Sequence, residues 1–304
     1  MKRKVIQLAH KTFVVSLPSK WVKKQGIKKG DELEAEEHAS SMVFSTEQKK
    51  NIEKASLDIT NTNERTIRWL LSSLHKKGYD EIELTYDSPD KTRIIHELVK
   101  DLFIGFAVVH QSSKRCVLRA IAQDRGEEFE NVLRRSFLVT LSMAEGMLDY
   151  MERGHQKQLS DLTALEKTNN QLTNFCERTL NKMGHLEYAK TCFYYVIVWN
   201  LEKICDDYKY ICELLSNSTE KISKESLELL KETNKFLRAY YDLFYTFDIQ
   251  QLNRLSERKK EMITKAHKLI SLKKGAESAM LSYLTSMIYK ISDFSASMIS
   301  LNTN

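Results

Sequence analysis

Proline and glycine are scarce in this sequence of 304 residues, which holds 2 prolines and 9 glycines. Because these residues are the strongest breakers of regular structure, their scarcity predicts long uninterrupted elements and excludes a chain built mainly of turns. The longest apolar run, residues 192–199, falls far short of the ~20 residues that a membrane-spanning helix needs. The charged N-terminus lacks the apolar centre of a secretion signal. We therefore expect a cytoplasmic protein without membrane insertion.

Cysteine pairs with the spacing of a metal or redox site are also absent, because no two cysteines form a C-x-x-C pair. Most of the cysteines fall within apolar helical patterns, so we expect buried free thiols. The five are Cys116, Cys176, Cys192, Cys205 and Cys212. A hydrophobic content of 42% and a charged content of 29% are ordinary for folded proteins and argue against disorder. The length allows two or three domains.

Charge is sorted along the first 50 residues. The first 29 residues hold nine Lys or Arg and no acid, whereas residues 31–37 hold five acids and no base. Residues 1–50 carry +5 of the net charge of +6, so the rest of the chain is nearly balanced. A partner with phosphates is therefore expected at the N-terminal end.

Residues 1–48 have the pattern of a small unit of hairpins around one short helix. Residues 4–17 are rich in β-branched side chains and predict one or two strands. A short helix follows, and Gly26 predicts its end. The alternating residues 33–36 and the apolar residues 42–44 predict another pair of strands. About 45 residues of hairpins bury too little surface to be stable alone, so we expect this unit to self-associate.

The stretch RKVIQLAHKTFVVSLPSKWVKKQGIKKGDELEAEE, residues 3–37, resembles the swapped-hairpin DNA-binding module of the AbrB and SpoVT family. The core SLPSKWVKKQGIKKGDEL is its most specific part. The resemblance implies that two chains interlock their hairpins into one dimeric β-barrel that binds DNA through basic residues. The candidates by position are Lys2, Arg3, Lys4, Lys11, Lys20, Lys23 and Lys24. The alternative is that these side chains only solvate a small domain, since charge runs usually face water.

Residues 51–125 predict a small βαβαββ layer with its helices on one face of the sheet. Strands are expected near residues 56–59, 82–86, 106–110 and 115–121, with one helix between the first and second strands and another between the second and third. The layer contains no Gly-rich phosphate loop and no nucleophile elbow. It fits a connector or a sensor domain as well as a catalytic one.

Residues 126–304 contain no proline and are helical in pattern throughout. Breaks are expected near Gly154, Gly184, 216–219, 246–248 and 273–275, which divides the region into about six long helices. The third and sixth of these share a K-I-x-D core, in LEKICDDYKYIC at 201–212 and IYKISDFSASMI at 288–299. A duplicated three-helix unit, about 126–218 and 222–301, explains this echo most simply. The whole chain is therefore expected to be a multidomain, mainly α protein.

The sequence LEKICDD also resembles the signature of the third helix in PhoU-type domains, and ALEKTNNQLTNFCERTL at 164–180 resembles their second helix. PhoU proteins are duplicated three-helix bundles that regulate phosphate uptake together with a phosphate ABC transporter and a sensor kinase. A swapped-hairpin module ahead of such a bundle resembles the archaeal phosphate-uptake regulators. The two resemblances cover residues 1–48 and 126–304 and leave the middle layer unmatched.

Glu202 and Asp206 lie four residues apart, so both carboxylates share one helix face about 6 Å apart. Two acids held together need a counter-charge, and a metal ion bound through oxygen would supply one. The PhoU resemblance adds Glu166 and Asp293 as candidate ligands and implies divalent, iron or zinc ions as possible cofactors.

The candidate metal ligands depart from the family pattern in two places. Asn170 and Tyr289 stand where PhoU relatives usually have acids, so the second site is expected to be degraded. The competing interpretation is that Lys203, Lys167 or Lys209 balances the acidic pair through solvent.

Enzyme signatures are weak. Glu152 and His155 have the E-x-x-H spacing of di-metal oxidases, but the motif occurs once and straddles Gly154, whereas two inward-facing copies are needed. No histidine stands at a recognisable distance from a nucleophile. Aromatic residues at 193–199 and 236–245 are expected to pack in the core rather than line a ligand pocket. We therefore expect no catalytic activity.

These observations favour a dimeric transcriptional regulator of phosphate uptake that binds a roughly palindromic operator. In this interpretation the hairpins bind DNA, and the bundle receives a signal that changes DNA affinity. The main alternative is a signalling adaptor whose hairpins only dimerise it, while its bundle docks a transporter ATPase or a sensor kinase.

Overall fold

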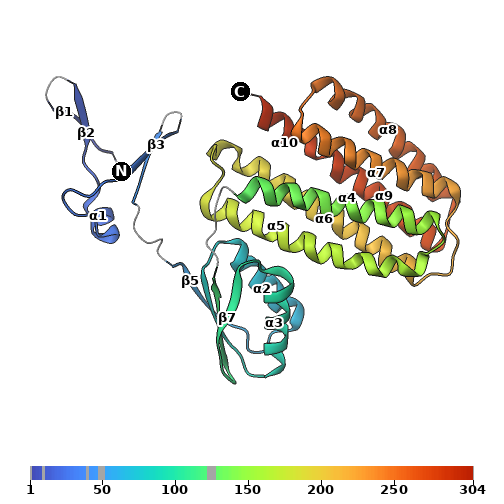
Figure 1. Cartoon of the computed structure of the whole chain (residues 1–304), viewed down its shortest axis with the longest axis horizontal. Helices are drawn as coiled ribbons and strands as arrows, with labels where there is room; N and C mark the ends of the chain where they lie inside the picture. The colour runs from blue at the N-terminus through green and yellow to red at the C-terminus, as the bar shows by residue number, and fades with distance from the viewer. Residues whose placement is uncertain (1, 9–10, 39–40, 47–51, 122–127, 304) are drawn as a thin grey trace. The chain divides into compact units, whose positions relative to one another are not determined.

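The computed structural model shows a mainly helical chain that divides into two compact units, Met1–Asn51 and Ile52–Asn304 (Figure 1). The predicted domain boundaries at residues 48, 51 and 125 fall outside the described residues. The residues that the structure describes are 2–8, 11–38, 41–46, 52–121 and 128–303.

The first unit consists of two hairpins and a short helix, as the sequence predicted. β1 pairs with β2, and β3 pairs with β4, both antiparallel, in two separate two-stranded sheets. Gly26 ends the helix with a φ of 67°, in the left-handed region that glycine adopts without strain. The elements are β1 (Val5–Leu8), β2 (Thr12–Val15), α1 (Ser19–Gln25), β3 (Glu34–His38) and β4 (Ser41–Ser45).

The second unit begins with an α/β layer, whose βαβαββ order confirms the prediction. Its sheet has the order β5-β6-β8-β7, in which β5 and β6 are parallel and β8 is antiparallel to both of its neighbours. The elements are β5 (Lys54–Asp58), α2 (Glu64–Lys76), β6 (Glu81–Thr85), α3 (Asp90–Leu102), β7 (Phe106–Gln111) and β8 (Arg115–Ala120).

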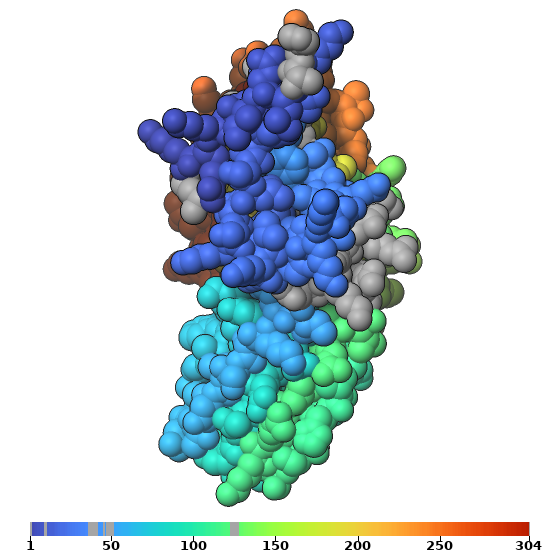
Figure 2. All heavy atoms as spheres, turned by 90° about the vertical axis from the view of Figure 1, so that its left-hand side faces the viewer, coloured from blue at the N-terminus to red at the C-terminus, as the bar shows by residue number. Residues whose placement is uncertain are grey.

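The two faces of this sheet differ in character because side chains alternate along each strand. Ile82, Leu84 and Leu118 are fully buried in the core that the sheet forms with α2 and α3. The opposite face carries ion pairs such as Arg119 with Glu81 and is exposed. Figure 2 looks onto this open side, where the early strand (light blue) and the late strands (green) of the layer are visible. Because this second face is charged, it can stay in contact with water, and the sheet needs helices on its other face only.

The rest of the second unit is a bundle of long helices. Their breaks fall where the sequence predicted, at Gly154, at Gly184 and near residues 217–223, 246–248 and 273–274. None of the helices in the described ranges has the length and apolar composition that spanning a bilayer requires. The helices are α4 (Phe129–Glu152), α5 (Thr163–Met183), α6 (Thr191–Ser216), α7 (Lys224–Tyr245), α8 (Ile249–Leu272), α9 (Gly275–Ser292) and α10 (Phe294–Asn302), with 3-10 segments at Gln156–Leu162 and Tyr188–Lys190.

One break differs from the prediction, because the expected sixth helix is divided at Asp293 into α9 and α10. The last turn of α9 is intact, because the backbone N–H of Asp293 donates to the carbonyl of Tyr289 at 3.0 Å and the hydroxyl of Ser292 donates to the same carbonyl at 2.8 Å. The stretch after α4 also differs from the prediction, because it forms a 3-10 helix where only a break was expected. Its Gln156 side-chain amide donates to the carbonyl of Leu215, which fixes a 3-10 segment against the end of α6.

The helices form two groups of three consecutive members around one shared core. Within each group every helix contacts the other two, and across the groups α4 contacts α7 and α6 contacts α9, while the short α10 packs against α6. The aromatic residues expected in the core are only partly there: Phe236, Tyr240 and Tyr241 are buried, whereas Trp199 and Tyr245 are exposed. The hydroxyl of the buried Tyr208 donates to the side chain of Asn234, so these two core polar groups are paired with each other.

Four of the five cysteines are buried and all five are free, which confirms the expectation for every cysteine except the exposed Cys192. Burial raises the pKa of Cys116 to about 11 and that of Cys212 to about 12. Thiolates, the reactive form, are therefore suppressed at these positions.

Replacing Gly78 with alanine is expected to destabilise the second unit more than replacing Gly154. Both glycines have positive φ, 97° and 75°, so each substitution strains the backbone by about 1 kcal/mol or more. Only at Gly78 would the new Cβ also lie 3.0 Å from the Cβ of Lys182 on α5. Denaturant unfolding of both variants measures the difference, and equal losses would contradict a tight contact at Gly78.

Candidate functional site

The first candidate site is the basic surface of the N-terminal unit. All seven predicted DNA-binding residues are exposed, and none forms an ion pair with another described residue. Lys20, Lys23 and Lys24 lie on α1, where their spacing of three and four places them on one side of the helix. The others lie on the segment before β1 and beside the β1–β2 turn, at Lys2, Arg3, Lys4 and Lys11.

The described residues of the same unit form no buried core. None of its described side chains is buried, and its apolar side chains are mostly exposed, with Phe13 at 66% and Val5 at 64%. Because residues alternate between the faces of a strand, the exposure of every residue of β1 means that both faces of this hairpin are open. The unit thus combines unpaired positive charge with an apolar surface that needs a cover.

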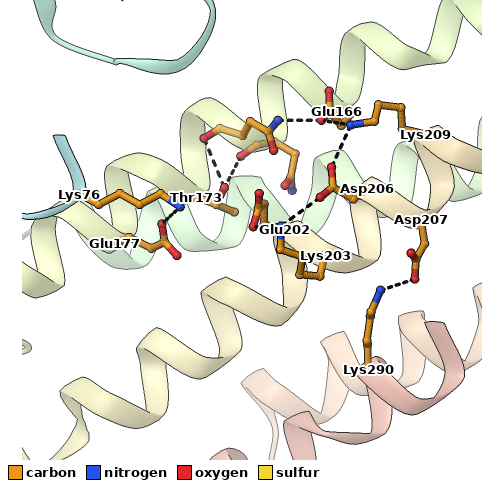
Figure 3. A network of polar contacts seen from close by, with 12 residues as sticks. Lys76, Glu166, Thr173, Glu177, Glu202, Lys203, Asp206, Asp207, Lys209 and Lys290 are labelled. Carbon is orange, nitrogen blue, oxygen red and sulfur yellow. Dashed lines mark hydrogen bonds and ion pairs between the residues drawn. The ribbon is translucent and has the colours of Figure 1, made fainter. Parts of the chain in front are cut away.

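The second candidate site is a network of charged side chains between α5 and α6 (Figure 3). The Lys209 ammonium donates to Glu166 at 2.7 Å and to Asp206 at 3.0 Å. Lys203 contacts Asp206 at 3.2 Å and Glu202 at 3.1 Å. Three of the four predicted metal-ligand positions therefore gather in one place, and two lysines lie among them.

The network sets the protonation of its carboxylates. Burial acts to raise the pKa of Asp206, but its hydrogen bond with Lys209 and the charges of both lysines outweigh burial and hold that pKa below its ordinary value. At Glu166 burial dominates over the contact with Lys209, so the pKa of this carboxyl is raised. The same contacts overcome the burial of Lys209 and raise its pKa, so its ammonium stays charged.

Asp293 is not part of this network. It is exposed at the junction of α9 and α10. Asp293 belongs to the second K-I-x-D core. The lysine of that core, Lys290, donates to the carboxylate of Asp207 on α6 at 2.7 Å. Within the described parts of the chain, no group of three or more His, Cys, Asp or Glu residues has the geometry to hold a metal ion.

Lys203 and Lys209 balance the acids by direct contact and not through solvent. The third candidate, Lys167, pairs with Asp101 on α3 instead. Asn170, one of the departures from the family pattern, donates its amide to Glu166 at 2.7 Å. A metal ion would have to displace ammonium groups that already neutralise Glu166 and Asp206. Metal binding therefore remains a prediction.

The network continues toward the α/β layer through a pair that the sequence analysis missed. Glu177 on α5 is buried and contacts the ammonium of Lys76, the last residue of α2, at 2.5 Å. The ring of Trp199 lies near both Lys76 and Lys203, with the two ammonium nitrogens 5.5 and 5.1 Å from its centroid. Burial raises the pKa of Glu177, and Lys76 offsets this only partly.

Arg178 on α5 forms the centre of the contact between layer and bundle. Its side chain is 1% exposed and donates to the backbone carbonyls of His75 and Tyr79, at 3.0 and 2.8 Å. It also contacts the carboxylate of Asp80 at 2.9 Å, and its guanidinium lies over the ring of Phe106. A helix leaves its last carbonyls unpaired, so Arg178 satisfies the end of α2 and complements its dipole.

The helix α5 makes similar contacts on both sides of Arg178. Lys182 also contacts Asp80, and the amide of Asn181 donates to the carbonyl of Lys76. Toward the other end of α5, the amide of Gln171 donates to the carbonyl of Lys100 in α3 at 2.8 Å. The layer is therefore seated on α5 by the C-terminal ends of both of its helices. The sequence signal for this contact is a charged pair, Glu177 and Arg178, which interrupts the apolar helical pattern around Cys176 and Leu180.

The E-x-x-H motif does not form a site. Glu152 ends α4 and His155 lies beyond it, with both side chains exposed.

A surface hollow of about 630 Å³ at the α7–α8 connection is lined by residues that include Tyr245, and the guanidinium of Arg134 lies over the ring of Tyr245.

Comparisons of the chain with protein-family models, with curated proteins and with solved structures gave no match.

Replacing Arg178 with alanine is expected to destabilise the second unit by about 3–5 kcal/mol, because Asp80 and two backbone carbonyls lose a buried partner. Urea unfolding at neutral pH measures this loss. Arg93→Ala is the matched control, since Arg93 is 63% exposed and its ion pair with Glu97 contributes little. A loss no greater than that of the control would show that the buried contact does not hold the layer in place.

Glu177→Gln is expected to change how stability depends on pH. The pKa of Glu177 is raised in the folded state, so the folded protein binds more protons than the unfolded chain. Stability is therefore present below the ordinary value of 4.5 and is lost as pH rises through the raised value. The variant lacks this loss and should gain stability relative to the parent with rising pH. Urea unfolding between about pH 4 and 8 tests this, and a constant difference would contradict it.

Proposed function

We propose that the chain is a DNA-binding transcriptional regulator that acts as a dimer. The observation that carries this proposal is the N-terminal unit, in which apolar side chains and seven unpaired cations are exposed together. Fully burying one large apolar side chain stabilises a fold by about 1.5–3 kcal/mol, and this unit leaves at least eight such side chains largely uncovered.

A second copy of the same unit is the natural cover for this surface. Short hairpins need further strands against their apolar faces, and an identical chain supplies them at matching positions. Interlocked hairpins, as in the AbrB and SpoVT family that residues 3–37 resemble, would form one barrel from two chains. The cations on α1 and around β1 would then occur twice, related by the dimer's twofold axis.

Exposed lysine and arginine side chains on a twofold dimer fit the phosphates of duplex DNA. Contacts to phosphate position a protein on the duplex and make binding fall steeply with salt. The operator is then expected to be roughly palindromic, because two related half-sites face one dimer.

The bundle is proposed as the part that receives the signal. Its resemblance to PhoU-type domains suggests that the signal concerns phosphate supply, and ions bound near Glu202 and Asp206 are one form that the signal could take. Because α5 holds the α/β layer, a rearrangement between α5 and α6 would reach the layer through Glu177 and Arg178. By linkage, DNA would change the affinity for the signal by the same factor.

A signalling adaptor is the alternative, and exposed apolar residues in the bundle favour it. Leu186 and Tyr188, in the connection between α5 and α6, are 85% and 74% exposed. Neighbouring large apolar side chains on a surface are typical of protein contacts. In this case the chain would dock a transporter ATPase or a sensor kinase and would not bind DNA.

DNA binding by the full-length chain distinguishes these functions. Fluorescence anisotropy at two salt concentrations would compare DNA from the protein's own upstream region and from phosphate-transporter promoters with random DNA. We expect selective binding that weakens with salt, and we expect Lys20→Gln, Lys23→Gln and Lys24→Gln together to abolish it without changing the dimer seen by sedimentation.

The matched control replaces three exposed lysines of the second unit, Lys77, Lys114 and Lys157, with glutamine. It removes the same charge and should leave DNA binding nearly unchanged. Equal and weak binding of the unmodified protein to every DNA would rule out the regulator and support the adaptor.

A further inference from the structure

The helix α8 and the two residues after it form a second region of concentrated positive charge. Residues 249–274 hold eight Lys or Arg and two acids, a net charge of +6. Residues 1–50 carry +5 of the chain's total of +6, so all remaining residues together carry −5. The chain is thus acidic apart from two regions, and the function proposed above uses only one of them.

The position of α8 leaves its charged side free. Within the second unit it contacts α7 and α9 and lies at the opposite edge of the bundle from α5 (Figure 1). Its apolar side, with Leu252, Leu255 and Met262, is buried against those neighbours. The opposite side is exposed along the whole helix, from Asn253 to Ser271.

Several of the cations on α8 already have partners. Lys265 contacts Glu232 on α7, and Lys259 lies over the ring of Tyr289. Arg254 and Arg258 line a hollow beside acidic side chains, which partly offset their charge. Lys273 contacts Glu225 and Glu277.

Lys260, Lys268 and Lys274 are different, because all three are exposed and form no ion pair with any described residue. Lys260 and Lys268 lie on the same side of α8, about 12 Å apart along its axis. Thr264 lies between them, and His267 and Ser271 share the same exposed side. This side also carries the exposed carboxylates of Glu257 and Glu261, but its cations outnumber these acids and have small hydrogen-bonding side chains between them.

The composition of this side distinguishes between classes of anionic partner. A membrane-surface helix inserts an apolar face, but the apolar face of α8 is buried in the bundle. A protein partner is usually anchored by aromatic or large apolar side chains at the centre of the contact, and the exposed side of α8 has none between Ile249 and Leu272. Spaced lysines with Ser, Thr and Asn match a phosphate backbone, which is contacted without apolar anchors.

We propose that the exposed side of α8 binds the phosphate backbone of duplex DNA. This inference rests on the proposed DNA-binding function and extends it, because the DNA-contacting surface would include the bundle as well as the N-terminal unit. The contact is independent of base sequence, so it adds affinity and salt dependence but no selectivity.

The test replaces Lys260, Lys268 and Lys274 with glutamine in the full-length chain. Binding to a duplex of about 60 base pairs, which is about 200 Å long at the rise of B-DNA, is measured over a series of salt concentrations. Each phosphate contact contributes about 0.9 to the slope of log affinity against log salt, so the slope should become less steep by about 2–3 for each α8 of the dimer that contacts the duplex. The preference for operator over random DNA should be unchanged. The control is the Lys77, Lys114 and Lys157 triple variant, which removes the same charge elsewhere.

The outcomes separate this inference from the proposed function. A flatter slope in the α8 variant alone supports the inference. If the unmodified protein binds DNA and the two triple variants behave alike, the inference is wrong and the proposed function stands. If the unmodified protein binds no DNA, both are wrong. Binding to anionic phosphatidylserine vesicles that is lost in the α8 variant, with DNA binding unchanged, would also overturn the inference and assign the surface to lipid.

Discussion

The buried guanidinium of Arg178 is the interaction on which the arrangement of the second unit depends. An arginine without solvent must have its donors satisfied, and here the carbonyls of His75 in α2 and of Tyr79 after α2 accept from it, and Asp80 supplies a carboxylate. This single side chain fixes where α5 meets the layer. The neighbouring contacts of Glu177, Asn181 and Lys182 then follow from the helical spacing on α5.

The charged network between α5 and α6 shows how the same acidic pattern can serve two purposes. Glu202 and Asp206 are spaced as metal ligands would be, yet Lys203 and Lys209 already compensate them. A lysine ammonium and a metal ion would both reduce the same repulsion, because carboxylates this close repel unless a positive charge lies between them. The lysines make the pair stable without an ion, and they also set the energy that an incoming ion must overcome.

Local signals in the sequence predicted most of the elements, and long-range contacts account for most of what was missed. Gly26, Gly154 and Gly184 mark ends that depend on backbone conformation alone, so the sequence places them well. The break at Asp293 has no glycine or proline near it, so the sequence carries no signal of the kind that marks the other helix ends. The contact of Arg178 joins residues about one hundred positions apart, and no periodicity within α5 could reveal its partners. For the same reason Glu166, Glu202 and Asp206 could be predicted as a set. The position of Lys209 between Glu166 and Asp206 could not be predicted.

The way in which α2 and α3 end on α5 also bears on how such a chain could have been assembled. The layer and the bundle look like separate modules in the sequence, but the helix ends of one are capped by side chains of the other. A foreign bundle would present no donors to those carbonyls, and a foreign layer would leave Arg178 without acceptors. The layer and the bundle would therefore have to be inherited together.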